Sequence, residues 1–583
     1  MQTFKKILYL LNPQERYRAG LLLIIMIIMA LVDMIGVASI LPFIAVLTNP
    51  DIIETNIILK KMFQALNIFG VENNQQFTFV LGILVLLLLI TSLVFKALGT
   101  YVQARFVQMR EYSIAKRLIE GYLHQPYSWF LNRNSADLGK TILSEVSVII
   151  GNGLRPMMEL ISKGLVAITL ISLLIIIDTK IALIIGFLLS LTYGLIFYFI
   201  ESYLKRIGQE RLKSNQLRFI AVNEALGAVK EVKIGGLEQV YIKRFSDPAQ
   251  IYTRTSISSD IIGQLPRFAF EAIVFGGIML VILFLMAQKG SLNNALPIIS
   301  LYIFAGYRLM PALQQIYASL TSLSFIGPAL DSIIDEIKNF KKFDSNENQS
   351  SLSFNKAITL KNIYYSYPDA SRTALKDINI KIPAKTTVGI IGSTGSGKTT
   401  TADIILGLLE PQQGTLEVDG QIISKQNVRA WQRCIGYVPQ HIYLSDNTIS
   451  ANIAFGVEPK NINQESVEKA SRIANLHEFI INELPKKYQS TVGERGVRLS
   501  GGQRQRIGIA RALYHNPNVL VLDEATSALD NLTEKKVMET IKNLSNDKTI
   551  IIIAHRLTTI QNCNYVIKLN QGKIEFIKDD YKI

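Results

Sequence analysis

The N-terminal half of this chain contains about six stretches of roughly twenty apolar residues, the length that a helix needs to cross a bilayer. A segment that crosses a membrane must satisfy its own backbone hydrogen bonds, so continuous apolar runs of this length predict helices. The pattern therefore predicts an all-α transmembrane domain of six helices within residues 1–337. The predicted spans centre on residues 21–46, 77–97, 148–177, 181–200, 261–286 and 295–320.

Basic residues beside these spans predict the orientation of the domain. Lys and Arg cluster before the first span and after the second and fourth, and such ends face the cytoplasm. The formal net charge of +15 then follows from membrane topology and a solvated cytoplasmic face, so no nucleic-acid partner is expected. Cys434 and Cys563 fall in the cytoplasmic part and are not expected to form a disulfide.

A glycine-rich loop begins directly after the apolar run 388–391 and opens a segment of helical character. A strand, a glycine loop and a helix start together form an anion site, because backbone N–H groups can close on phosphates. Lys398 would reach the β and γ phosphates, and the Thr399 hydroxyl would bind Mg²⁺. The predicted phosphate-binding residues are Gly392, Ser393, Thr394, Gly395, Ser396, Gly397, Lys398, Thr399 and Thr400.

Two carboxylates end a second apolar run, at 519–522. A buried strand would deliver Asp523 to the metal, and Glu524 to the place where a base polarises an attacking water. These two residues therefore predict hydrolysis of the bound nucleotide, not binding alone.

The sequence Leu-Ser-Gly-Gly-Gln at 499–503 precedes the helix-forming segment 504–513 and predicts a second phosphate site. Ser500, Gly501, Gly502 and Gln503 would lie at a helix start suited to a γ-phosphate. Since the first loop would already cradle one triphosphate, a second site predicts two copies of this domain that meet head to tail. One chain carries both halves, so a homodimer is the economical expectation.

With these motifs in this order, residues 354–583 resemble the nucleotide-binding domain of ABC transporters, an α/β P-loop cassette that uses ATP and Mg²⁺. The resemblance implies that Tyr367 stacks on adenine, with Tyr364 and Tyr365 open as packing residues. It implies that Gln440 senses metal and water, and that His555 contacts the γ-phosphate. The implied catalytic residues are Glu524, His555, Lys398 and Gln440, and the implied metal ligands are Thr399, Gln440 and Asp523.

Six spans followed by a cassette on one chain resemble the exporter-type half-transporter. The domains would then be a transmembrane domain at 1–337, a polar linker at 338–353 and the cassette at 354–583. The resemblance implies ATP-driven closure of two cassettes in the cytoplasm beneath a bacterial inner membrane. Two segments, near 125–130 and 223–232, resemble the turns that couple cassette to membrane domain.

Charged residues at membrane depth carry the information on substrate, because they are costly unless paired or functional. Arg267 stands four positions from Glu271 and Arg155 four from Glu159, so local ion pairs are a strong alternative reading for both. Lys96 and Arg308 have no acidic residue at three or four positions, although Lys96 could also snorkel to the inner interface. Basic residues in the inner half of the bilayer would suit a phosphorylated lipid that enters from the cytoplasmic leaflet.

Segments at 33–43, 266–267 and 307–311 resemble the bacterial PglK-type flippases, which move lipid-linked oligosaccharides. The resemblance implies a polyprenyl-pyrophosphate oligosaccharide bound near Lys96, Arg267 and Arg308. Lys96 stands where an arginine would be expected, so bidentate contact with phosphate is in doubt there. The segment 57–69 has one apolar face, which predicts either a helix on the outer interface or a cap packed on the bundle.

Other functions remain open. A lipid A or multidrug exporter would share every cassette residue, and a peptide or protein exporter would need a periplasmic partner. A regulatory ABC protein would use ATP to gate a channel. The predicted spans argue against soluble ABC proteins that act on ribosomes or DNA.

Overall fold

The computed structural model describes residues 2–68, 71–177, 179–268, 296–340, 352–368, 372–526, 528–554 and 563–579, with a few isolated positions between them. Two compact units divide the chain. One unit comprises Met1–Gln125 and Asn132–Lys341, and the other comprises Pro126–Leu131 and Lys342–Ile583. Most of the linker predicted at 338–353 lies outside the described residues.

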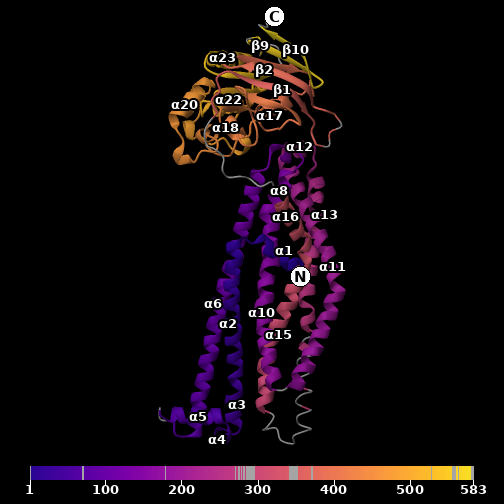
Figure 1. The fold of residues 1–583 in the computed structure, drawn as a ribbon, viewed down its shortest axis with the longest axis vertical. Helices are drawn as coiled ribbons and strands as arrows, with labels where there is room; N and C mark the ends of the chain where they lie inside the picture. The colour runs from indigo at the N-terminus through magenta and orange to yellow at the C-terminus, as the bar shows by residue number, and fades with distance from the viewer. Residues whose placement is uncertain are drawn as a thin grey trace. The chain divides into compact units, whose positions relative to one another are not determined.

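The first unit consists of helices that run side by side (Figure 1). Asn12 and Glu15 form a capping box at the start of α2, where Pro13 takes the first helical position. Asn73 and Gln76 cap α6 in the same way. The α-helices are α1 (Gln2–Leu10), α2 (Pro13–Ala38), α3 (Ile40–Thr48), α4 (Ile52–Thr55), α5 (Ile57–Asn67), α6 (Asn74–Leu123), α8 (Ser135–Lys140), α9 (Val146–Ile149), α10 (Arg155–Ile177), α11 (Thr179–Gly227), α12 (Val229–Ile234), α13 (Glu238–Gln264), α15 (Leu296–Phe325) and α16 (Gly327–Asn339), and the π-helical turns are η1 (Thr141–Glu145) and η2 (Ile150–Leu154).

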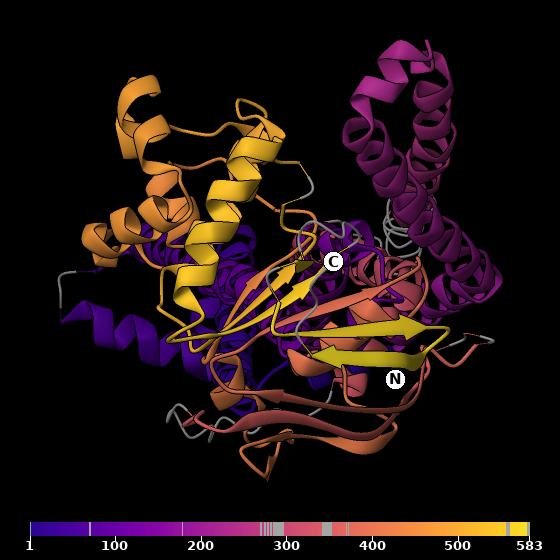
Figure 2. The ribbon, with the colours of Figure 1, turned by 90° about the horizontal axis from the view of Figure 1, so that it is seen from above.

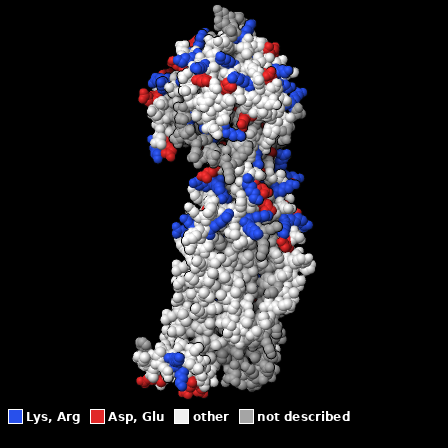
Figure 3. Space-filling view, viewed as in Figure 1, with Lys and Arg blue, Asp and Glu red and all other residues white. Residues whose placement is uncertain are grey.

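Three helical stretches of the described residues are long and apolar enough to cross a membrane, namely Pro13–Thr48, Asn74–Leu123 and Ser135–Ile177. They contain the first three predicted spans. Helix α11 covers the fourth predicted span and α15 nearly all of the sixth, whereas the fifth is described only in part. On the face shown in Figure 3, the bundle has a broad uncharged band with charged side chains at its two ends, as expected for a bilayer-spanning domain.

The second unit contains two β-sheets and a group of helices, which separate clearly when seen from above (Figure 2). The four-stranded antiparallel sheet has the order β2-β1-β4-β5, and the six-stranded sheet has the order β10-β9-β3-β8-β7-β6. In the larger sheet β9, β3, β8, β7 and β6 are parallel, and β10 is antiparallel to β9. The strands are β1 (Ala357–Tyr365), β2 (Leu375–Pro383), β3 (Thr387–Gly392), β4 (Gln413–Val418), β5 (Gln421–Ile422), β6 (Ile435–Val438), β7 (Val519–Asp523), β8 (Thr549–Ile553), β9 (Tyr565–Asn570) and β10 (Lys573–Asp579).

Helices cover the larger sheet, and its central strands are consequently apolar along their whole length. Every residue of β7 and β8 is buried, which is typical of parallel strands enclosed on both faces. The helices of this unit are α7 (Tyr127–Phe130), α17 (Lys398–Ile405), α18 (Val428–Gln432), α19 (Ile449–Ile453), α20 (Gln464–Ile473), α21 (His477–Glu483), α22 (Gly501–Leu513) and α23 (Asn531–Leu544), with the 3-10 turns η4 (Pro459–Asn461), η5 (Lys487–Gln489) and η6 (Glu494–Gly496). The short helix α7, one of the two predicted coupling segments, thus belongs to the same compact unit as the cassette.

Candidate functional site

At two positions of the glycine loop after β3, a residue with a side chain would strain the backbone or collide with neighbouring atoms. Gly392 has φ +154°, and a Cβ there would lie 2.3 Å from the Leu569 carbonyl oxygen. Gly397 has φ +102°, and a Cβ there would lie 2.6 Å from Leu375 Cδ2. Such values of φ favour glycine, and the loop leads directly into the N-terminus of α17. The sequence prediction of a strand, a phosphate loop and a helix is met by this geometry.

The amine of Lys398 folds back over this loop. Its Nζ donates to the carbonyl oxygens of Gly392, at 2.9 Å, and Ser393, at 3.1 Å. Burial lowers the pKa of Lys398, while the carboxylates of Glu524 and Asp523 oppose that shift. The Ser396 hydroxyl is buried and has no hydrogen-bond partner among the described residues. The loop therefore holds donors that an anion could engage.

Asp523 and Glu524 stand at the carboxyl end of β7, beside the loop of β3. Strand β8 lies between β7 and β3, and the carboxyl ends of parallel strands meet at one edge of the sheet. Asp523 is buried, and Glu524 has φ +50°, a left-handed conformation that is unusual for a residue other than glycine. Such strain persists where the surrounding structure fixes it, and it is concentrated at active sites.

Contacts from two other elements fix the position of Glu524. Its N–H donates to the Ile553 carbonyl oxygen at 3.0 Å. Gln440, two residues after β6, donates from Nε2 to Glu524 Oε2 at 2.8 Å. The structure thus joins two of the four residues predicted to be catalytic. His555, another of the four, lies outside the described residues.

The metal-binding residues predicted from sequence are oxygen donors from three segments, namely Asp523, Thr399 and Gln440. Within the described residues no group of three or more His, Cys, Asp or Glu side chains could hold a metal. Mg²⁺ in nucleotide sites is bound through one or two carboxylates and the substrate phosphates, not by an all-protein cage. The chemistry of one buried carboxylate, one hydroxyl and one side-chain amide therefore fits Mg²⁺ once a nucleotide is present.

Of the three candidate tyrosines, Tyr367 lies beside the helix that follows the loop. Its hydroxyl is 3.1 Å from the Thr400 hydroxyl, and its ring makes an edge contact with Tyr365. Tyr365 is buried in the core between the sheets, so it is a packing residue. Tyr367 is half-buried and packs against the edge of the same core, and its stacking on adenine stays a prediction.

The second predicted phosphate site forms the N-terminus of α22. Ser500 is its N-cap: the Ser500 hydroxyl accepts from the Gln503 N–H at 3.2 Å, and Gln503 Oε1 accepts from the Ser500 N–H at 2.8 Å. Gly501 and Gly502 lie so close to Ala528 and Leu529 that a Cβ on either would approach within 3.2 Å. This pair of glycines lets the helix start pack tightly while its amides face outward.

The sequence does not predict a structural role for Gln505, whose side chain makes two hydrogen bonds to distant backbone groups. Its Oε1 accepts from the Ala528 N–H at 3.0 Å, and its Nε2 donates to the Glu524 carbonyl oxygen at 3.5 Å. Gln505 is buried one turn into α22. It links the helix of the second phosphate site to the segment that carries the predicted base.

In the membrane unit, the structure changes the interpretation of Arg308. The sequence offers it no acidic neighbour at helical spacing, yet Arg308 NH1 lies 2.5 Å from Asp33 Oδ1, on α2. The local pair between Arg267 and Glu271 is formed, at 2.7 Å. Glu159, however, is not paired with Arg155 among the described ion pairs, and accepts instead from Gln315 Nε2 at 2.5 Å. Lys163 of α10 interacts electrostatically with Lys96 and Asp33, a relation that spacing along one helix cannot predict.

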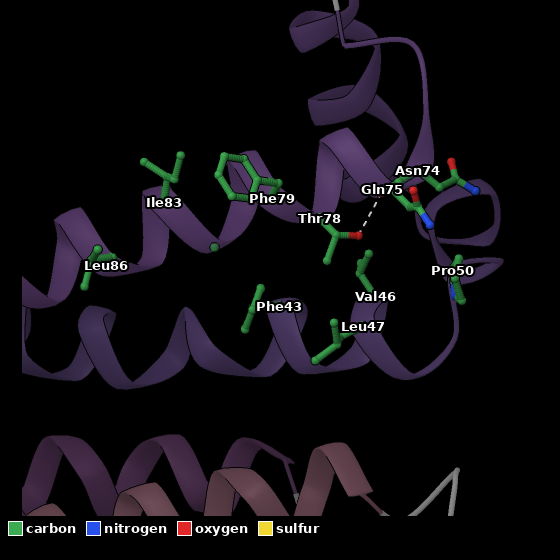
Figure 4. A pocket seen from close by; sticks show the side chains of 11 residues that line it. Phe43, Val46, Leu47, Pro50, Asn74, Gln75, Thr78, Phe79, Ile83 and Leu86 are labelled. Atoms are coloured by element: carbon green, nitrogen blue, oxygen red, sulfur yellow. Dashed lines mark hydrogen bonds between the residues drawn. The ribbon is translucent and has the colours of Figure 1, made fainter.

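The amphipathic segment between the first two spans packs one side against the bundle and leaves Ile57, Ile58 and Ile68 exposed. Helix α5 buries Leu59 against a cluster that includes Phe77, and Phe63 makes an edge contact with that ring at 5.3 Å. Next to this segment, a cavity of about 630 Å³ lies between α3 and the start of α6 (Figure 4). Its walls are mainly apolar, with Asn74, Gln75 and Thr78 at one end.

Comparisons with known proteins agree with both units. Residues 39–308 match the family described as ABC transporter transmembrane region, and residues 375–527 match the family described as ABC transporter. An ATP-dependent lipid A-core flippase of Cupriavidus metallidurans is 29% identical over 469 residues, which cover 79% of this chain and 77% of that protein. The mitochondrial iron-sulfur clusters transporter ABCB7 of Danio rerio is 30% identical over 383 residues, covering 63% and 50%.

A solved structure has the same fold. A bacterial Atm1-family ABC exporter with ATP bound superposes with a TM-score of 0.78, at 23% identity, and the match covers 98% of this chain and 96% of that chain. A helical transmembrane domain followed by an α/β ABC ATPase is therefore the fold of this chain.

Proposed function

Because the chain belongs to the ABC transporter family, as an exporter-type half-transporter with an ATPase cassette, we propose that it flips a phosphate-bearing lipid across the inner membrane. The substrate that we propose is a polyprenyl-pyrophosphate oligosaccharide, moved from the cytoplasmic to the outer leaflet. The observation that carries this proposal is the group of cationic side chains at membrane depth, Lys96, Lys163 and Arg308, in a chain that hydrolyses ATP. Cationic side chains at membrane depth are rare, and they usually face a cavity or an anionic partner. An anionic lipid headgroup could therefore bind to them.

Hydrolysis would use the residues around the phosphate loop. Lys398 would exchange its bonds with the loop carbonyls for bonds with the β and γ phosphates, and the loop amides would hold the same groups. Thr399, Asp523 and Gln440 would hold Mg²⁺, which supplies positive charge against the charge that develops on the phosphates. Glu524, held at Oε2 by Gln440, would orient the attacking water and accept its proton.

We propose that two identical chains complete each other's sites. At the N-terminus of α22, Ser500 is exposed and Gly501 and Gly502 are partly exposed, and they belong to a different segment from the loop that would already hold the triphosphate. A helix start of this kind favours an anion, so a γ-phosphate bound by the partner cassette is the natural occupant. His555 would contact the same phosphate.

A second candidate substrate is lipid A, which also carries phosphate. It is supported by the similarity to proteins named lipid A-core flippases, which covers most of the chain. Drug and peptide exporters remain weaker candidates because their substrates do not require buried cations.

The test is translocation in proteoliposomes of a fluorescent polyprenyl-pyrophosphate oligosaccharide and, separately, of lipid A. Glu524→Gln should leave nucleotide binding intact and lower ATP hydrolysis by about 10²–10⁴, so flipping should stop. Arg308→Ala should reduce flipping of a phosphate-bearing lipid while Lys205→Ala, which removes an exposed cation paired with Glu201, should not. Hydrolysis of ATP without movement of either lipid would refute the proposed substrate class.

A further inference from the structure

Asp33 is a buried carboxylate inside the membrane unit, and it has two polar partners from distant parts of the chain. Its Oδ1 accepts from the Ser92 hydroxyl of α6 at 3.1 Å and from Arg308 NH1 of α15 at 2.5 Å. The Asp33 side chain is 5% exposed and that of Arg308 is 17% exposed. The carboxylate thus joins three helices, and the Arg308 side chain keeps a small exposed surface.

Tight packing between the helices brings Asp33 and Arg308 into contact. Asp33 lies between Ala30 and Val37 on the face of α2 that is buried against α10 and α15. On α15, Arg308 lies between Ala305 and Ala312, which are buried in the same cluster. Small residues let membrane helices approach closely, and here they bring a carboxylate and a guanidinium together.

A second cation reaches this cluster from α10. Lys163 stands one turn before Val166 and Ala167, which belong to the same buried core. It interacts electrostatically with Asp33 and also with Lys96 and Glu159. Glu159 is held by Gln315. Lys163 thus connects three cations with two carboxylates, and these five groups together carry one uncompensated positive charge when all are ionised.

An arginine at membrane depth is costly without a counter-ion, and Asp33 supplies one inside the protein. An anionic headgroup that reaches Arg308 must therefore compete with Asp33 for the same guanidinium. Lys163 and Lys96 favour that exchange because their positive charge attracts the incoming anion and remains when Asp33 is displaced. When the anion leaves, Asp33 can return to Arg308, which favours release.

We propose that the Asp33 carboxylate pairs with Arg308 between transport cycles and that a lipid phosphate or pyrophosphate displaces Asp33 from Arg308 during transport. Lys163 is then a further substrate-positioning residue, which attracts the phosphate to this pair. This inference rests on the proposed function and adds a substrate-binding residue and a competitor to it. The exchange is between two anions and involves no covalent step.

The experiment uses the intact protein in nanodiscs and measures ATPase stimulation against the concentration of added lipid. The lipids are a polyprenyl-pyrophosphate oligosaccharide, lipid A and an uncharged glycolipid of similar chain length. Asp33→Asn should lower the half-saturating concentration of a phosphate-bearing lipid by about tenfold, a usual size for coupling between two binding events. Lys163→Gln should raise that half-saturating concentration. Neither substitution should change the half-saturating concentration of the uncharged glycolipid.

Glu145→Gln is the matched control, because Glu145 forms a buried ion pair with Arg211 at 2.7 Å elsewhere in the same unit. It removes a carboxylate from an arginine without touching the cluster. At saturating lipid, Asp33→Asn should also slow flipping, because the competitor that favours release is missing. If Asp33 and Lys163 had only structural roles, Asp33→Asn and Lys163→Gln would shift the half-saturating lipid concentration in the same direction.

The outcomes separate the two proposals. If the native protein responds to a phosphate-bearing lipid but both variants match Glu145→Gln, the role of Asp33 and Lys163 is overturned and the proposed function stands. If neither phosphate-bearing lipid stimulates the native protein, both proposals fall. A response to lipid A alone assigns the headgroup to that source, and the variants are then judged with lipid A.

Discussion

Asp403 gives the sharpest quantitative prediction for the cassette. It lies in α17, directly after the phosphate loop, and is 8% exposed. Burial, together with the nearby Asp523 carboxylate, raises the pKa of Asp403 from an ordinary value of 3.8 to about 6. Because the folded state holds this proton longer than the unfolded state does, stability is greatest below pH 3.8 and is lost as pH rises towards 6.

The size of the effect follows from the two pKa values. Each pH unit between them corresponds to about 1.4 kcal/mol, so the charged form of Asp403 destabilises the cassette by about 3 kcal/mol at pH 7. Asp403→Asn should remove this pH dependence. The difference in unfolding free energy between variant and native protein should therefore change by about 3 kcal/mol in the variant's favour from pH 3.5 to pH 7. A constant cost of burying the amide cancels in that comparison.

Tryptophan fluorescence can follow this transition. Trp431 is fully buried beneath α17, and its Nε1 donates to the Ile405 carbonyl oxygen at 2.7 Å. The other tryptophan is Trp129, so a Trp129→Phe background isolates the cassette signal. Urea unfolding of the intact protein in detergent, without nucleotide, should be measured at several pH values.

Asp419 is the control of opposite sign. Burial alone would raise the pKa of Asp419, but the backbone N–H groups of Asn355, Lys356 and Ala357 donate to its carboxylate and lower it. Asp419→Asn should therefore destabilise the cassette at pH 7, and its deficit should shrink as pH falls. A difference between Asp403→Asn and the native protein that stays constant from pH 3.5 to 7 would refute the assignment of the raised pKa to Asp403.

Three further predictions concern the nucleotide site. Gly397→Ala should abolish binding of a fluorescent ATP analogue, because the Cβ of the alanine would meet Leu375 at 2.6 Å. A retained far-UV circular dichroism spectrum would show that the membrane helices remain folded. Undiminished ATP binding would contradict the loop geometry. Ser500→Ala should cost about 1 kcal/mol of stability through loss of the N-cap and should lower hydrolysis more than it lowers nucleotide binding, whereas equal losses in both would argue against a role in the partner's site. Removal of Mg²⁺ with a chelator should stop hydrolysis while leaving ATP bound, and added Mg²⁺ should restore it; hydrolysis that persists without divalent cations would exclude the predicted metal ligands.

Much of the cassette could be predicted from the sequence because each of its functional groups lies at the end of one local element. The glycine loop follows β3 directly, the two carboxylates end β7, and Ser500 begins α22. Spacing along a strand or helix fixes such positions without knowledge of distant contacts. The contact between Gln440 and Glu524 joins residues 84 positions apart, so it depends on the adjacent placement of β6 and β7.

The membrane unit shows the opposite case. Hydrophobic length alone determined that this region forms membrane-spanning helices, because only a helix of that length satisfies its backbone in lipid. The same reasoning could assess ion pairs only within a single helix, at three or four positions. It found the pair of Arg267 with Glu271 and left Arg308 without a partner.

The sequence by itself thus indicated a helical transmembrane domain followed by an ATPase domain, and it predicted the phosphate loop, the metal and base carboxylates and a second phosphate site, since each is expressed in local spacing. Only the tertiary structure decided that Arg308 meets Asp33, 275 positions away, and that Lys163 joins the same cluster. The physical reason is that helix packing, through small residues such as Ala30 and Ala305, selects which side chains share a buried space. A pattern read along one helix carries no information about the helix that will lie against it.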